Sequence, residues 1–205
     1  MKIAILGGTP LAKTLGKKYI EEGINVVFGV SPEFNIDEPE WKSLNKFYHR
    51  LCPYESAIIQ GEFILLCNEN GDFPEIWCAL KNSDTEGKII IDCTSGSFDT
   101  KTGFSNTSLI QKAAPKAKVF KAFNNLGIDY QEFRRPDSKI QTYYCGEETP
   151  QKLRVRRLIE IIGMEAIDAG LIYNATLLEA FRRIQADRIF PMNMKGSNSS
   201  NFLSA

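Results

Sequence analysis

The chain has 205 residues, of which 43% are hydrophobic and 24% are charged, and this composition excludes a disordered or fibrous protein. Lys and Arg together number 25, as do Asp and Glu, so the formal charge is zero. A neutral chain lacks the basic surface that binds nucleic acids or anionic membranes, so neither is expected as a partner. No apolar run reaches membrane-spanning length, and the run before Gly7 is too short for a signal peptide, so we expect a cytoplasmic protein.

Metal and disulfide chemistry are both disfavoured by the composition. The five cysteines form no Cys-x-x-Cys pair, and an odd number argues against a disulfide framework. His49 is the only histidine, which excludes a multi-histidine metal site and leaves little basis for Ser-His-Asp or Cys-His catalysis. We therefore predict no metal site and a surface or structural role for His49.

Short apolar runs alternate with amphipathic stretches along the chain. The apolar runs predict strands over residues 2–6, 24–30, 63–67, 88–93, 118–122, 141–145 and 165–168. The amphipathic stretches predict helices over residues 10–22, 36–47, 55–60, 73–82, 108–114, 150–162 and 173–190. Because the strands are apolar on both faces, we predict an α/β fold with a doubly wound, mainly parallel sheet covered on both sides. Residues 1–190 are expected to form one Rossmann-like domain that ends in a helix, and residues 191–205 a flexible tail.

The turn between the first predicted strand and helix is the main functional signal. It reads Gly7-Gly8-Thr9-Pro10-Leu11-Ala12, close to the Gly-x-Gly-x-x-Gly/Ala pattern of dinucleotide-binding folds, with Thr9 replacing the middle glycine. Gly7 supplies the tight turn, and Ala12 stands where helix and strand approach. Thr9 is also a good N-cap and Pro10 a good first helical residue, so a turn without a ligand would use the same residues. A helix N-terminus at the end of a central strand is an anion site, which favours nucleotide binding by residues 7–12.

Three further positions bear on the cofactor. No Asp or Glu lies between positions 24 and 32, where an NAD-specific protein usually holds the ribose hydroxyls, whereas Ser31 is present. This pattern favours NADP(H), by a modest factor because no Lys or Arg follows until Lys42. Cys67 ends a predicted central strand and either borders the ligand crevice or packs inertly, and Asn68 after it either contacts the ribose or caps a loop.

Several segments resemble a known family, the NADP oxidoreductases that depend on the deazaflavin coenzyme F(420). The most specific are Lys121-Ala122-Phe123-Asn124 and Asp168-Ala169-Gly170, and Gly7-Gly8-Thr9 and the Phe-Gly-Val-Ser of 28–31 also match. The resemblance spans nearly the whole chain and extends to the cytoplasmic domain of transmembrane ferric reductases. It implies a cytoplasmic homodimer that passes a hydride between NADP(H) and a small flavin-like or deazaflavin acceptor.

The same resemblance implies roles for individual residues. It places Thr9 at the pyrophosphate, Ser31 at the ribose phosphate, and Ala122, Phe123 and Asn124 beside the nicotinamide. Asn124 is the one candidate for a catalytic contact, through the carboxamide or the acceptor. The alternative interpretation makes Phe123 a core residue and Asn124 a turn residue.

Two other functions stay open at this point. Pro10 stands where the family usually has glycine, and this altered loop suits a dinucleotide-binding sensor or regulatory module without turnover. A reductase of a small imine or acid is the other alternative, on fold analogy alone. A dehydrogenase acting on an alcohol would need a proton acceptor, and no His, Lys or Tyr is a convincing candidate.

Overall fold

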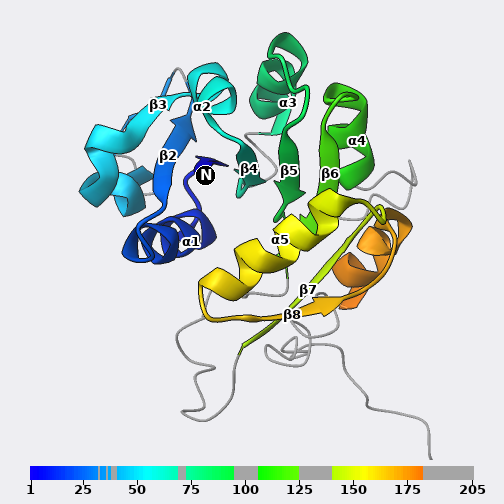
Figure 1. Ribbon diagram of the computed structural model, residues 1–205. Coiled ribbons are helices and arrows are strands. Elements are labelled where there is room, and N and C mark those ends of the chain that lie inside the picture. The colour runs from blue at the N-terminus through cyan, green and yellow to red at the C-terminus, as the bar shows by residue number, and fades with distance from the viewer. Residues whose placement is uncertain are drawn as a thin grey trace, which may run out of the picture.

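The computed structural model describes residues 1–31, 33–35, 37, 41–68, 73–94, 106–124 and 140–181. Within these ranges, eight strands form one sheet in the order β3-β2-β1-β4-β5-β6-β7-β8 (Figure 1). The strands are β1 (Lys2–Leu6), β2 (Asn25–Val30), β3 (Leu51–Pro53), β4 (Phe63–Leu66), β5 (Ile89–Asp92), β6 (Lys118–Ala122), β7 (Gln141–Gly146) and β8 (Glu165–Asp168). The helices are α1 (Pro10–Glu21), η1 (Trp41–Arg50), α2 (Tyr54–Gln60), α3 (Phe73–Asn82), α4 (Asn106–Ala113), α5 (Pro150–Ile161), η3 (Ile172–Asn174) and a last helix over 175–181.

The direction of the strands confirms the predicted doubly wound α/β fold. The six strands from β1 to β6 run parallel, and β1 pairs with both β2 and β4. The strand order therefore reverses between β1 and β4, and ligands of open α/β sheets bind beyond the carboxyl ends of the strands at such a point. β7 is antiparallel to β6 and β8 is parallel to β7, so the sheet is mainly rather than wholly parallel.

Two apolar cores cover the two faces of the sheet. One core packs α1, α5 and η1 against the sheet around Ile3, Ile5 and Phe120. The other packs α2, α3 and α4 around Ala4, Leu6 and Val119. β4 and β5 are buried along their whole length, as expected for strands enclosed between helical layers.

Two predicted helices differ from the structure. Within the expected helix over 36–47, the described residues form the 3-10 helix η1, which extends to Arg50 and is interrupted at Phe47. The ring of Phe47 stacks on Phe28 of β2, with 5.1 Å between ring centroids, so tertiary packing explains the departure from a regular helix. The expected helix over 173–190 is divided into η3 and the helix over 175–181. Residues 182–190 and the predicted tail over 191–205 lie outside the described residues.

No helix in the described ranges has both the length and the apolar composition needed to cross a bilayer.

Candidate functional site

The turn after β1 brings the ends of β1 and β4 into close contact. Gly7 has a φ of 108°, and a Cβ there would lie 2.5 Å from the carbonyl oxygen of Cys67. Only glycine combines this backbone conformation with this approach. The structure thus confirms that Gly7 makes the tight turn, and places it at the point where the strand order reverses.

The N-terminus of α1 opens directly above this turn. Thr9 is the N-cap, and its Oγ1 accepts a hydrogen bond from the N–H of Ala12 at 3.3 Å while donating one to the carbonyl of Cys67 at 2.7 Å. Pro10 is at the start of the helix, and the first turn carries no acidic residue. The partial positive charge of the helix end is therefore not offset by a carboxylate of the helix itself, which suits an anion.

Ala12 and Gly16 form the contact between α1 and the sheet. Ala12 is fully buried in the core, as its predicted place at the helix–strand approach requires. Gly16 makes a tighter approach, because a Cβ there would lie 2.3 Å from Cζ of Phe28. A charge at position 12 would be forced into the core, whereas Pro10 is exposed and offers a cleaner site for a test.

A cavity of about 380 Å³ lies at the same edge of the sheet, beyond β2. It is lined by three glutamates, Glu33, Glu55 and Glu75, together with Tyr54, Pro74 and Cys78. Ser31 lies two positions before Glu33 of this lining, and its Oγ accepts a hydrogen bond from the N–H of Glu33 at 3.3 Å. The sequence lacks an acid at positions 24–32, but the fold brings three carboxylates to this cavity from separate segments.

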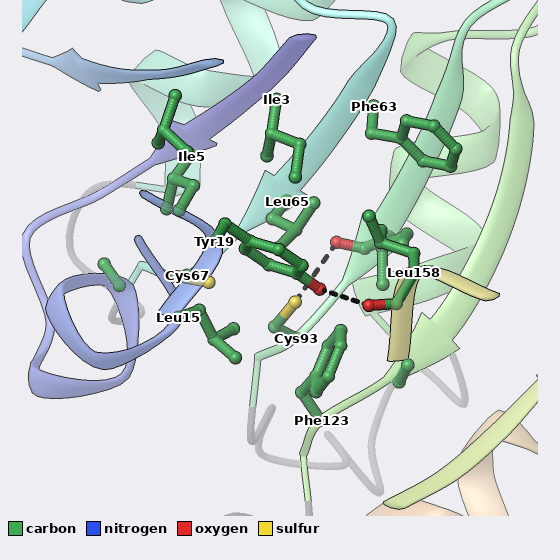
Figure 2. Close-up of a cluster of buried hydrophobic side chains, with 14 of the residues drawn as sticks. Ile3, Ile5, Leu15, Tyr19, Phe63, Leu65, Cys67, Cys93, Phe123 and Leu158 are labelled. Carbon is green, nitrogen blue, oxygen red and sulfur yellow. Dashed lines mark hydrogen bonds between the residues drawn. The ribbon is translucent and has the colours of Figure 1, made fainter. Parts of the chain in front are cut away.

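Cys67 and Cys93 directly follow the adjacent strands β4 and β5, and each is only 2% exposed. Figure 2 shows their sulfur atoms within the apolar cluster around Tyr19 and Phe123. Burial raises the pKa of the Cys93 thiol well above its ordinary value, and a hydrogen bond with Cys67 raises it further. Cys93 is therefore a packing residue, while the carbonyl of Cys67 anchors Thr9. Asn68 follows at the end of β4 and is also buried.

The end of β6 carries a strained turn. Phe123 has a φ of 63°, a conformation that costs a bulky residue about 1–3 kcal/mol and persists only where the surroundings enforce it. Ala122 before it is fully buried, and the Phe123 ring lies in the core beside Cys93 (Figure 2). The ring therefore pins the turn to the core, and this contact agrees with the interpretation of Phe123 as a core residue.

Asn124 follows this strained residue and is 1% exposed. Within the described part of the chain, neither its Nδ2 nor its Oδ1 has a hydrogen-bond partner. Buried amides are normally hydrogen-bonded, so an amide with two unsatisfied groups suggests a ligand that would satisfy them. The segment that follows, from Asn125, lies outside the described residues.

A buried ion cluster, which no sequence motif predicted, lies beside the same turn. Lys121 of β6 is fully buried and contacts Asp92 of β5 and Glu179 of the last helix, each at 2.9 Å. Burial lowers the pKa of Lys121, but the two carboxylates outweigh it and the pKa is raised. A charged residue near the end of each of two apolar strands was the available signal.

His49, the single histidine of the sequence, is exposed on η1.

Comparison with known proteins bears on the expected resemblance. Residues 2–96 match the family model described as NADP oxidoreductase coenzyme F420-dependent. This match confirms the resemblance over the part of the chain that runs from β1 to β5 and contains the Gly7–Ala12 turn.

Relatives extend the comparison to the rest of the chain. Metalloreductase STEAP3 from Rattus norvegicus is 23% identical over 181 residues, which cover 87% of this chain and 36% of that protein. The chain therefore spans about a third of that relative's length. A protein from Arthrobacter sp. FB24, described as an F420-dependent NADP reductase, superimposes with a TM-score of 0.76 at 22% identity and covers 93% of this chain and 94% of its own.

A reductive aminase from Aspergillus terreus, solved in complex with NADPH, has a TM-score of 0.66 at 15% identity. It covers 93% of this chain, which in turn covers 62% of it. At these identities the two structures show a shared fold.

Proposed function

We propose that this protein is an NADP(H)-dependent oxidoreductase that transfers a hydride between nicotinamide and a flavin or deazaflavin acceptor. The observation that carries the proposal is the pairing of two features at one edge of the sheet. One is the acid-free N-terminus of α1 where the strand order reverses. The other is the amide of Asn124 after β6, which has no hydrogen-bond partner among the residues that the structure describes. The match of residues 2–96 to an NADP oxidoreductase family supports the class of reaction.

The residues present fit an extended dinucleotide. Gly7 lets the turn pack against the backbone of Cys67, and the positive end of the α1 dipole, which no acidic residue of the first turn offsets, would hold the pyrophosphate. The cavity beside Ser31 would take the adenosine end, and the amide of Asn124 would pair with the carboxamide of the nicotinamide. β6 lies three strand positions from β1, roughly 14 Å at the usual spacing, so the two ends of the site are distinct.

The proposed reaction requires no acidic or basic side chain of the protein to transfer a proton. NADP(H) supplies the hydride when bound, and transfer between two cofactors requires alignment and exclusion of water. Asn124 would fix the orientation of the ring, and the Phe123 anchor would hold Asn124 in place. Because the cofactor supplies the reactivity and the protein the alignment, the proposed reaction needs no histidine among the described residues of the site.

We expect the preference for NADP(H) over NAD(H) to be modest. Ser31 can donate a hydrogen bond to a 2′-phosphate, but Glu33, Glu55 and Glu75 line the cavity beside it. Carboxylates near a phosphate weaken its binding by like-charge repulsion. The net preference depends on how far Ser31 and the helix end offset this repulsion.

The proposal is tested by incubating the protein with NADPH and a panel of acceptors: flavins, the deazaflavin coenzyme and a cyclic imine. Loss of the reduced-nicotinamide absorbance with a flavin or deazaflavin is the expected result. Turnover with the imine alone would favour a small-imine reductase. Measurable NADPH binding without turnover on any acceptor would favour a dinucleotide-binding module.

The resemblance also underlies our inference of a cytoplasmic homodimer. Light scattering on the purified protein should then give a mass twice the 23.1 kDa of one chain. A mass of one chain at micromolar concentration would contradict the inference.

A further inference from the structure

The ion cluster at the end of β6 uses every hydrogen-bond donor of Lys121. Its Nζ contacts Oδ2 of Asp92 at 2.9 Å, the carbonyl of Thr94 at 2.8 Å and Oε1 of Glu179 at 2.9 Å. An ammonium group has three N–H bonds, so each has one acceptor. The cluster therefore joins the ends of β5 and β6 to the last helix.

The carboxylate of Asp92 has hydrogen-bond donors on both oxygens, and none of them comes from Glu179. Its two oxygens accept hydrogen bonds from the N–H and hydroxyl of Thr94, at 3.0 and 2.7 Å, and from the hydroxyl of Thr107 at 2.6 Å, besides the bond from Lys121. One carboxylate balances one ammonium, so Asp92 alone neutralises Lys121. Neutralising Lys121 therefore does not explain why a second carboxylate is buried here.

Glu179 is the surplus member of the cluster. It is 5% exposed, and in the described ranges its Oε2 is buried with no hydrogen-bond partner. Burial of such a group is unfavourable unless another contact requires it. The contact that Glu179 adds is the one from its helix to Lys121, and the neighbouring Ala175 and Leu178 pack on Cys145, which is paired with Lys121 across the sheet.

Lys121 lies two residues before the strained Phe123 and three before Asn124. Its side chain lies with Asp92 and Glu179, away from the core that holds the Phe123 ring around Tyr19 and Cys93. The turn is thus fixed by two anchors, an ionic one at Lys121 and an apolar one at Phe123. A strained turn persists where such contacts over-determine it.

We propose that Glu179 is a positioning residue that acts through Lys121. By accepting the third hydrogen bond of Lys121, it docks the last helix on the end of β6 and holds the Phe123–Asn124 turn in its strained conformation. The consequence for hydride transfer rests on the proposed function. The consequence for the turn itself does not, because it concerns contacts within the chain.

The test compares two neutral variants of similar length, Glu179→Gln and Glu179→Met, in the full chain. Both remove the surplus charge and leave Asp92 to neutralise Lys121, but only Gln can still accept the hydrogen bond. We expect Glu179→Met to raise amide hydrogen exchange over residues 119–124 by about tenfold, and Glu179→Gln to stay within about twofold of the native protein. Turnover should follow the same order, with a loss of about tenfold in Glu179→Met.

Affinity for 2′-phospho-ADP-ribose should stay unchanged in both variants, because this fragment does not reach the turn. The matched controls are Glu147→Gln and Glu147→Met, which break an exposed 3.1 Å ion pair to Lys118 on the same strand and should change none of these readouts. A Met variant indistinguishable from the native protein, or a Gln variant as impaired as the Met variant, would overturn the proposal. If none of the acceptors in the panel supports NADPH oxidation by the native protein, the proposed function fails. The hydrogen-exchange measurement alone then decides the role of Glu179.

Discussion

Replacing Asn124 with leucine should stabilise the protein while impairing it. The amide is 1% exposed and both of its polar groups are unpartnered within the described residues. An unsatisfied buried group carries a desolvation penalty of about 1–3 kcal/mol, and leucine keeps the same side-chain skeleton, branched at Cγ, without polar atoms. We therefore expect Asn124→Leu to raise the free energy of unfolding by about 1–3 kcal/mol, or the melting temperature by roughly 2–4 °C per kcal/mol in a chain of this size.

The effect on activity should have the opposite sign. If the amide orients the nicotinamide, losing its hydrogen bonds should lower turnover by about 10- to 100-fold, or roughly 1.4–2.8 kcal/mol in the barrier. Affinity for 2′-phospho-ADP-ribose, which lacks the nicotinamide, should be nearly unchanged. The assay pairs NADPH oxidation with the best acceptor and thermal or urea unfolding of the same preparation.

Asn174→Leu is the matched control. Its Nδ2 donates to the carbonyl of Ala169 at 2.6 Å, so the same substitution there removes a hydrogen bond that the fold uses. This variant should lose about 1 kcal/mol of stability and keep its turnover. If Asn124→Leu is instead destabilised and fully active, Asn124 is a structural turn residue and the assignment of the nicotinamide end is wrong.

Three further predictions concern the cofactor and the ion cluster. Pro10→Asp should lower NADPH affinity by about tenfold or more in a folded protein, because an exposed carboxylate at the start of the helix repels a pyrophosphate. Pro10→Asn should bind NADPH normally. Equal NADPH affinities of the two variants by titration calorimetry would contradict an anion site at this helix end. Glu33→Gln should raise the ratio of NADPH to NADH affinity several-fold and Ser31→Asp should reverse it, and an unchanged ratio in both would show that the cavity does not hold the adenosine end. Burial raises the pKa of Glu179 above its ordinary 4.5, against the opposing effect of Lys121, so its share of stability is complete below that pH and is lost as the pH rises through the folded value. The free energy of unfolding in urea should therefore increase for Glu179→Gln relative to the native protein as the pH rises above 4.5. A difference between the two proteins that does not change with pH would refute this.

The sequence by itself determined the fold class and one end of the site. Apolar runs such as 63–67 and 88–93 are legible because a strand enclosed on both faces needs apolar residues at every position. The turn from Gly7 to Pro10 is legible because a tight turn, an N-cap and a first helical residue are each properties of neighbouring residues. These features are local, so the order of residues is enough to reveal them.

The tertiary structure alone decided the rest. The sequence places Asp92, Lys121 and Glu179 far apart, and they meet because β5 and β6 pair in one register and the last helix packs on β6. The same holds for the glutamates that line the cavity near Ser31, which come from three segments. Whether a charge is buried, or an amide is left without a partner, depends on which strands and helices surround it, and no local pattern encodes that.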